Sequence, residues 1–370
     1  MAVRGRWIPC VDHRGAEVRN FVSEYFGRPE CRALLIAGAG FDPRTTTVTK
    51  LFASVLRTHI AGLFLREERP DPDSALVARA DRELSALQSL VAESRVERIG
   101  VFDRDSTSAA TPHVVAGRYV AALAHGLDLT QFTDVVIDFS ALSVGTSFPL
   151  ARALLARMDA NREAVNLHAM VTTSPLTDAR IEPDPSTFVG PVHGFQGRWG
   201  IDETSKAAKL WLPQLRLGQS RILEDLYMAV RPDDVVPVIP FPAHDPRLGD
   251  KLIEHYAREL QNEWGVDPRN IIYAAEGDPL DFYRSVLRLD DARRPVFAGT
   301  IGSLIILSPL GSKALALGAM LAAIDRDLPV MYVEALGYQA QFEGEARFSE
   351  EDLVHVWLCG EAYESLGTAR

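Results

Sequence analysis

The chain has 370 residues, of which 47% are hydrophobic and 24% charged, a balance typical of a globular protein long enough for two domains. Its net charge of −11 disfavours extended binding to nucleic acid or to an anionic membrane, because both need a basic face. No apolar run reaches the roughly 20 residues of a membrane-spanning helix, and the N-terminus lacks the apolar core of a signal peptide. We therefore expect a cytoplasmic protein that does not bind membranes.

The cysteines and histidines give no metal-binding pattern. Cys10, Cys31 and Cys359 lack the spacing of metal ligands, and their odd number does not suit a disulfide framework. No His-x-x-x-His pair is present. We expect reduced, structural cysteines and no metal site.

Short apolar runs alternate with amphipathic stretches through the first half of the chain. This alternation, with apolar strands that are nearly uninterrupted, indicates parallel strands covered on both faces by helices. The predicted strands are 33–37, 59–65, 98–102, 135–139 and 166–172, and the predicted helices are 45–57, 75–91, 113–125 and 148–161.

The pattern lapses between residues 174 and 200, where several prolines and glycines interrupt it. We interpret this tract as a linker or a functional flap, and predict domains at 1–182 and 183–370. After it, strands are predicted at 235–239, 270–274, 304–307, 330–334 and 355–358, and helices at 212–231, 247–263, 279–289 and 312–326. The expected fold is therefore α/β, with two Rossmann-like domains whose sheets are mainly parallel and doubly wound.

The first predicted strand runs into GAGFDPR, residues 38–44, and then into a helix. Glycines at this position allow a tight turn and a close backbone approach to a ligand, which makes Gly38 and Gly40 candidate binding residues. Pro43 stands where the dinucleotide fingerprint needs a small third residue, so the stretch departs from the NAD pattern. Two other interpretations remain open: Asp42 caps the helix and Arg44 pairs with a nearby acid, or Arg44 and residues 45–47 bind a phosphate.

GAGFDPR also resembles the glycine motif of some S-adenosylmethionine-dependent methyltransferases. The resemblance implies that Gly38 and Gly40 lie against the methionine part of that cofactor. It also implies that Glu67 or Glu68, at the end of the next strand, binds the ribose hydroxyls. An acid also ends a central strand of the same half, since Asp138 follows the apolar run 135–137 and lies at the edge where α/β sheets bind ligands. Alternatively, Asp138 serves only to satisfy amides of its own loop.

A second candidate crevice lies in SPLGSK, residues 308–313, between an apolar strand and an Ala-rich helix. A strand, a turn of small residues and a helix aim backbone N–H groups at an anion, and Lys313 adds a positive charge. Gly311, Ser312 and Lys313 resemble the Gly-Ser/Thr-Lys element of CARF domains, which are Rossmann-like nucleotide sensors of prokaryotic defence. The resemblance implies ligand contacts by these three residues.

Polar residues follow two further strands of the second half. His244 and Arg247 come after the strand at 235–239, and Glu276 follows the strand at 270–274. Because the carboxyl ends of parallel strands share one edge of a sheet, we expect these residues to join the second crevice. His244 and Glu276 are candidates for an acid–base pair.

The leading functional hypothesis is a sensor or regulator, in prokaryotic antiviral defence, that binds a nucleotide or another phosphorylated, anionic small molecule. The second hypothesis is an enzyme, either an S-adenosylmethionine-dependent methyltransferase or a nucleotide-modifying transferase, acting at the first crevice. The third is a scaffold subunit that binds a protein partner or a second copy of the chain. The candidate cofactors are accordingly a nucleotide and S-adenosylmethionine.

Overall fold

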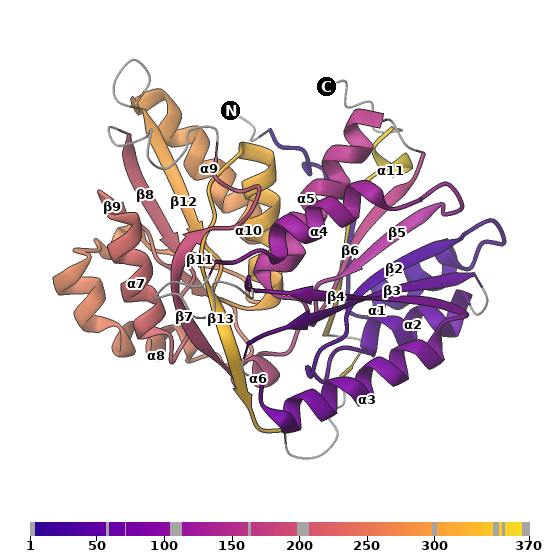
Figure 1. Ribbon diagram of the computed structural model, residues 1–370. Helices are drawn as coiled ribbons and strands as arrows, with labels where there is room; N and C mark the ends of the chain where they lie inside the picture. Colours follow the sequence, from indigo (N-terminus) through magenta and orange to yellow (C-terminus); the bar gives the residue numbers. More distant parts are fainter. Residues whose placement is uncertain are drawn as a thin grey trace. The chain divides into compact units, whose positions relative to one another are not determined.

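The computed structural model describes residues 4–56, 59–70, 72–103, 113–161, 164–197, 207–297, 302–342, 348–349 and 352–364. The chain forms two compact units. The first unit contains residues 9–184 and 335–370, and the second contains residues 1–8 and 185–334. Each unit is an α/β structure with parallel strands and connecting helices, which confirms the predicted fold class (Figure 1).

The first unit is built on a seven-stranded sheet with the order β1-β14-β6-β5-β2-β3-β4. The five strands from β2 to β6 are parallel. At one edge, β14 pairs antiparallel with β6, and β1 pairs antiparallel with β14. The strands are β1 (Asp12–Arg14), β2 (Ala33–Gly38), β3 (Ile60–Glu68), β4 (Glu93–Gly100), β5 (Asp134–Asp138), β6 (Asn166–Thr172) and β14 (Leu353–Cys359). The helices are α1 (Ala16–Phe21), the π-helical turn Val22–Phe26, α2 (Thr47–Leu56), α3 (Ser74–Leu90), α4 (Ala116–Gly126), α5 (Val144–Asn161), α6 (Pro175–Asp178) and α11 (Glu361–Glu364).

The strand order places β2, the first strand of the parallel set, in the middle of that set. β3 and β4 follow on one side of β2, and β5 and β6 follow on the other. Figure 1 shows α1, α2 and α3 on one face of this sheet and α4 and α5 on the other. The order in which strands are added therefore reverses between β2 and β5. Such a switch point is where open α/β sheets bind ligands.

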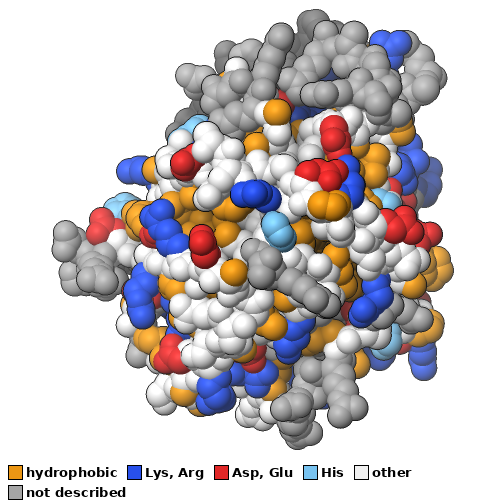
Figure 2. All heavy atoms as spheres, turned by 90° about the vertical axis from the view of Figure 1, so that its right-hand side faces the viewer, with side chains coloured by type: hydrophobic (Ala, Val, Ile, Leu, Met, Phe, Trp, Pro, Cys, Tyr) orange, Lys and Arg blue, Asp and Glu red, His pale blue; other side chains and the backbone are white. Residues whose placement is uncertain are grey.

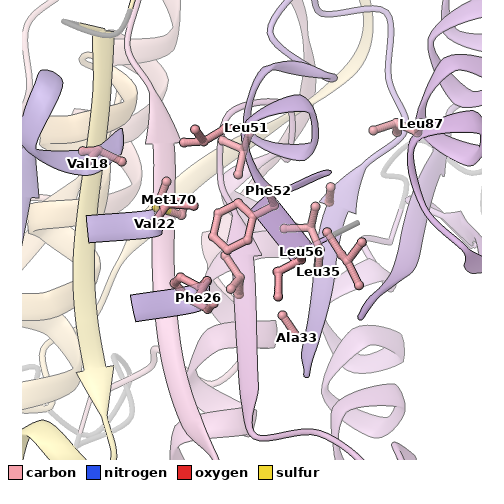
Figure 3. Packing of buried hydrophobic residues seen from close by; sticks show 14 of the residues in the cluster. Val18, Val22, Phe26, Ala33, Leu35, Leu51, Phe52, Leu56, Leu87 and Met170 are labelled. Carbon is pink, nitrogen blue, oxygen red and sulfur yellow. The ribbon is translucent and has the colours of Figure 1, made fainter. Parts of the chain in front are cut away.

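The hydrophobic core of the first unit lies between the sheet and α2. Its side chains come from α2, from β2 and β6, and from the segment that contains α1. In Figure 3, Leu51, Phe52 and Leu56 of α2 face the strands that carry Leu35 and Met170. The apolar run of β2 follows from its burial on both faces.

The C-terminal residues belong to the first unit, which differs from the predicted division into 1–182 and 183–370. Strand β14, predicted at 355–358 as part of the second domain, pairs with β6 of the first unit. Arg69 donates a hydrogen bond to the carbonyl oxygen of Ala335, and its guanidinium lies 4.8 Å from the centre of the Tyr338 ring. At the other end of the chain, Trp7 packs edge-on against Tyr283 of the second unit.

The second unit contains a three-stranded parallel sheet, β12-β8-β9, and a two-stranded parallel sheet, β10-β11. Single bridges extend these pairings, because Gln214 pairs with Val238 and Leu307 pairs with Val330. The strands are β8 (Ala208–Pro213), β9 (Asp234–Val235), β10 (Val238–Pro240), β11 (Ile272–Ala274), β12 (Ser303–Ser308) and β13 (Met331–Ala340). The helices are α7 (Ser220–Val230), α8 (Leu248–His255), α9 (Pro279–Phe297) and α10 (Lys313–Arg326), and the π-helical turn Glu259–Glu263 and the 3₁₀ turn Pro268–Asn270 follow α8.

Including the bridges, the second unit repeats the strand order of the first. Its first strand, β8, has β9 and β10 and then β11 on one side, and β12 and then the segment at Val330 on the other. The sequence prediction missed β8, whose last two residues overlap the helix predicted at 212–231. The helix in this region, α7, begins only at Ser220.

The tract at 174–200 holds regular structure where we predicted a linker or flap. It contains α6 and the strand β7 (Ile181–Pro191), which pairs with β13 in a two-stranded sheet. Pro183 and Pro185 lie inside β7, which is tolerated because a strand at an edge leaves some backbone N–H groups without a strand partner. No described helix is long and apolar enough to cross a membrane.

We predict that the two glycines of GAGFDPR differ in how they tolerate a side chain. A Cβ at Gly38 would lie 2.7 Å from the carbonyl oxygen of Ala141, whereas a Cβ at Gly40 would lie 3.7 Å from it. Gly38→Ala should therefore lower the free energy of unfolding by roughly 1–3 kcal/mol, and Gly40→Ala should change it by less than about 0.5 kcal/mol. Urea denaturation of both variants measures the difference, and equal losses would contradict the close approach.

Candidate functional site

The switch point between β2 and β5 of the first unit brings together buried polar residues from three connections. Asp42 and Arg44 come from the loop after β2, Asp138 and Ser140 from the end of β5 and its loop, and Asp178 from α6. We call these five residues the switch-point cluster. The sequence predicted Asp42, Arg44 and Asp138 as site residues, and the structure places all three here.

Arg44 is clamped between two aspartates and is only 1% exposed. Its Nε and Nη2 donate to the two carboxylate oxygens of Asp42 at 2.9 and 2.7 Å. Its Nη1 lies 2.9 Å from Oδ1 of Asp178. Burial by itself would lower the pKa of Arg44, but the charges of Asp42 and Asp178 outweigh it and raise that pKa.

Asp42 also accepts the backbone N–H of Arg44 at 2.9 Å. Its carboxylate therefore stabilises the turn that leads into α2. Of the interpretations open from the sequence, the structure shows the one in which Arg44 pairs with acids. The residues after it are buried too, since Thr45 and Thr46 are 0% and 4% exposed.

Asp138 carries a buried carboxylate with one unsatisfied oxygen. It is 1% exposed, and its Oδ1 accepts the backbone N–H of Ser140 at 2.9 Å and the Ser140 hydroxyl. Its Oδ2 is buried with no hydrogen-bond partner among the described residues. Burial raises the pKa of Asp138 to about 7, and the negative charge of Asp42 raises it further. The hydrogen bonds from Ser140 and the positive charge of Arg44 lower this pKa but do not outweigh the burial.

The end of β6 adds a second group with unused hydrogen-bonding capacity. The Ser140 hydroxyl accepts the backbone N–H of Thr172 at 2.8 Å, which joins Thr172 to Asp138 through Ser140. The Thr172 hydroxyl is buried and has no partner in the described part of the chain. A buried acceptor and a buried hydroxyl without partners mark the place where a ligand or an ordered water would bind.

The acids expected to bind ribose are engaged within the protein. Glu67 accepts the backbone N–H and the hydroxyl of Ser143 at 3.0 and 2.8 Å, and it pairs with Arg69 at 3.0 Å. Burial would raise the pKa of Glu67, but Arg69 and the Ser143 bonds outweigh it and lower that pKa. Glu68 pairs with Arg98 at 2.7 Å. Together with the approach of Ala141 to Gly38, these contacts occupy several of the groups that the methyltransferase interpretation assigned to the cofactor.

In the second unit, the turn before α10 is closed by Gln214, which directly follows β8. The backbone N–H of Gly311 donates to Oε1 of Gln214 at 3.1 Å, and Nε2 of Gln214 donates to the carbonyl oxygen of Leu315 at 2.9 Å. Gln214 is 1% exposed. The amide of Gly311, which the sequence offered to an anion, therefore already has a partner.

Three of the residues predicted for the second crevice contact one another. Ser312 caps α10 by accepting the N–H of Leu315, and its hydroxyl donates to the carbonyl oxygen of Glu276 at 2.7 Å. The carboxylate of Glu276 accepts the backbone N–H of His244 at 2.8 Å. The His244 side chain is exposed and is not the group that meets Glu276, so these contacts tie loops together without forming an acid–base pair.

The two cations of the second crevice have different positions. Arg247 is exposed, and its backbone N–H donates to Asp245 at the start of α8. Lys313 is partly buried in the first turn of α10. On the face drawn in Figure 2, Lys and Arg side chains are interspersed with Asp and Glu rather than gathered in one patch.

Sequence reasoning missed Asp178, Thr172 and Gln214. Asp178 lies in the Pro-rich tract, and Gln214 in a stretch predicted as helix, so neither had a strand-end position to mark it. Thr172 ends a predicted strand, and that position was the one available signal. Among the described residues, no group of three His, Cys, Asp or Glu is arranged to hold a metal ion.

Comparisons with known proteins give no relative of this chain. No protein family matches the sequence, and no curated protein is similar to it. Among solved structures, the zinc-inhibited form of teicoplanin deacetylase Orf2 matches with a TM-score of 0.25 and 11% identity, over 43% of this chain and 77% of that one. Phytolacca americana UGT2, complexed with UDP-2fluoro-glucose and pterostilbene, matches with a TM-score of 0.23 and 10% identity, over 87% and 88%.

We predict that Arg44 is essential for stability. Arg44→Met would leave the buried carboxylates of Asp42 and Asp178 without a cation, which should cost about 3–5 kcal/mol of unfolding free energy. Arg98→Met is the matched control, because the pair with Glu68 is exposed and should contribute less than about 1 kcal/mol. Urea denaturation tests both, and similar losses for the two variants would contradict the assigned role.

We predict a pH-dependent gain in stability from Asp138→Asn. Because the pKa of Asp138 is about 7 in the folded protein and 3.8 is its usual value, the folded state holds a proton that the unfolded chain releases. Wild-type stability therefore falls as the pH rises between these values, and asparagine removes this loss. The gain should be small near pH 4 and reach roughly 4 kcal/mol at most near pH 9. Urea denaturation across this range measures it, and a gain independent of pH would contradict the shifted pKa.

Proposed function

We propose that this protein binds a nucleotide or a nucleotide-like small molecule at the switch-point cluster of the first unit. The observation that carries the proposal is the buried Oδ2 of Asp138, which has no hydrogen-bond partner among the described residues. Leaving a buried carboxylate oxygen unsatisfied costs stability, and such groups occur where a protein binds something else. Its position, at the carboxyl end of β5 beside the switch point, is where α/β sheets bind ligands.

The charges of the cluster favour a particular part of the ligand. Asp42 and Asp178 already neutralise Arg44, and Asp138 adds a third carboxyl group. A phosphate would be repelled by this excess of acids, whereas a hydroxyl or amino group can donate to the Oδ2 of Asp138. We therefore infer that the nucleoside part of the ligand faces Asp138.

The proposal moves the binding site from the second unit to the first. In the second unit, Gln214 takes the amide of Gly311, and Glu276 takes the hydroxyl of Ser312. In the first unit, the backbone of Ala141 approaches Gly38 at the end of β2, and the Oδ2 of Asp138 remains without a partner among the described residues. We propose a ligand-responsive regulator as the form of this function.

A second candidate is a nucleotide-modifying transferase that uses Asp138 as a general acid or base. The specific observation in its favour is the pKa of about 7, because a group that titrates near neutral pH can both give and take a proton. Product formation from a bound nucleotide, absent in Asp138→Asn, would favour the enzyme over the regulator.

The binding test uses the full-length protein and a ligand panel of nucleosides, nucleotides, cyclic oligonucleotides, NAD and S-adenosylmethionine. A member that binds should raise the melting temperature by mass action, and calorimetry then gives its affinity. Asp138→Asn should bind it at least about tenfold more weakly, since a hydrogen bond to a charged group contributes roughly 1.5–3 kcal/mol. Affinity should also rise as the pH increases through about 7, because the ionised carboxylate is the better acceptor.

The controls separate this site from the second crevice. Lys313→Ala and the exposed Asp128→Asn should both bind like the wild type. If Lys313→Ala abolishes binding and Asp138→Asn does not, the site lies in the second unit. Stabilisation by S-adenosylmethionine alone would instead restore the methyltransferase hypothesis.

A further inference from the structure

A chain of three histidines crosses the first unit and ends at Asp134. His13 lies on β1, His355 on β14, His168 on β6 and Asp134 at the start of β5, and these four strands are neighbours in the sheet. His13 Nδ1 is 3.0 Å from His355 Nδ1, and His355 Nε2 is 3.0 Å from His168 Nδ1. His168 Nε2 is 3.1 Å from Asp134 Oδ1. Each distance is that of a hydrogen bond, so the chain is continuous.

The chain runs from solvent into the core. His168, His355 and Asp134 are all fully buried, while His13 is partly exposed. Aromatic rings pack along the imidazoles: Phe21 stacks on His13 and His355 at 4.2 and 4.4 Å, and Trp357 lies 4.6 Å from His168. His13 Nδ1 is bonded to His355, so Nε2 is the nitrogen of His13 left to exchange protons with water.

The contacts allow one arrangement of protons at neutral pH. Burial lowers the pKa of all three histidines, so each is neutral and carries one N–H. Burial would raise the pKa of Asp134, but the bonds from His168 and Thr133 outweigh it and lower that pKa, so Asp134 is ionised. His168 must donate to it from Nε2. His355 must then donate to His168 from Nε2, and His13 must donate to His355 from Nδ1.

We propose that this chain is a proton relay that takes a proton from solvent at His13 and delivers it to Asp134. The proton binds His13 Nε2, and the Nδ1–H bond of His13 breaks as a new N–H bond forms on His355 Nδ1. His355 then passes its Nε2 proton to His168 Nδ1, and His168 passes its Nε2 proton to Asp134 Oδ1. One proton is gained, all three imidazoles end neutral with the opposite tautomer, and every hydrogen bond of the chain is kept.

Tyr25 connects the end of the relay to the C-terminal helix α11. Its hydroxyl lies 3.0 Å from Asp134 Oδ1 and 2.9 Å from Glu361 Oε1, so a single proton faces two acceptors. When Asp134 is protonated, the Tyr25 hydroxyl donates to Glu361 instead. At the outer end of the relay, the charged groups near His13 are Glu17 and Asp12, and Asp12 is paired with Arg14. At the inner end, Cys31 and Tyr25 contact Asp134, and Arg28 and Glu361 contact Tyr25.

The test is a nitrogen NMR measurement of the imidazole tautomers in the full-length wild-type protein. At neutral pH we expect the proton on Nε2 of His168 and His355 and on Nδ1 of His13. Because the pKa of Asp134 lies below its usual value of 3.8, the relay should load Asp134 only as the pH is lowered past that value. Both buried imidazoles should then move their proton to Nδ1 while remaining neutral, and the carboxylic acid band of Asp134 should appear in the infrared spectrum. Starting tautomers of the opposite kind, or a cationic His13 with unchanged buried tautomers, would overturn the relay.

Two variants sharpen the test. His13→Phe keeps a ring to stack on Phe21 but removes the outer end of the relay, so the tautomers of His168 and His355 should no longer invert as the pH is lowered. His125→Phe, at an exposed position of α4, is the matched control and should invert like the wild type. Inversion in His13→Phe at the wild-type pH would show that the proton reaches Asp134 by another path, and the proposal would fail.

Discussion

The constraint on which each unit depends is that its first strand lies in the middle of a parallel sheet. The second strand is added on one side and the fourth on the other, so the connections after the first and fourth strands leave toward opposite faces. In the first unit these connections carry Arg44 and Asp138. Because the gap between them is buried, each polar group there needs a partner, and the clamp of Asp42 and Asp178 on Arg44 meets that need.

The two units meet this constraint in different ways. In the second unit, the carboxamide of Gln214 spans the gap between the first and fourth strands and bonds to both Gly311 and Leu315. In the first unit, Gly38 allows the backbone at Ala141 to approach, and the oxygen of Asp138 remains without a partner. The same strand order therefore surrounds two different gaps. Gln214 closes the gap in the second unit, whereas the gap in the first unit contains an oxygen of Asp138 without a hydrogen-bond partner among the described residues. This difference is why we place the proposed site in the first unit.

The sequence predicts the fold best for strands that are buried on both faces of the sheet. Strands β2, β5 and β6 are buried throughout and are built around apolar runs, because helices cover both of their faces. Asp42, Arg44 and Asp138 stand out because they come at or after the ends of such runs. The exposed edge strand β4 extends over 93–100 rather than the predicted 98–102, since its polar residues hide its start. The pairing of β14 with β6 and the contacts of Asp178 and His355 join residues far apart in the chain, which no local pattern records.

The position of β14 also bears on the order in which the protein can acquire its structure. Synthesis on the ribosome proceeds from the N-terminus, so β6 emerges before residues 185–334 of the second unit, and β14 emerges after them. Until then β6 has no neighbour on one side, and His168 lacks the imidazole that will hydrogen-bond to it. The first unit is thus the last to be finished, and the open edge of β6 must be kept from pairing with other chains while residues 185–334 are translated.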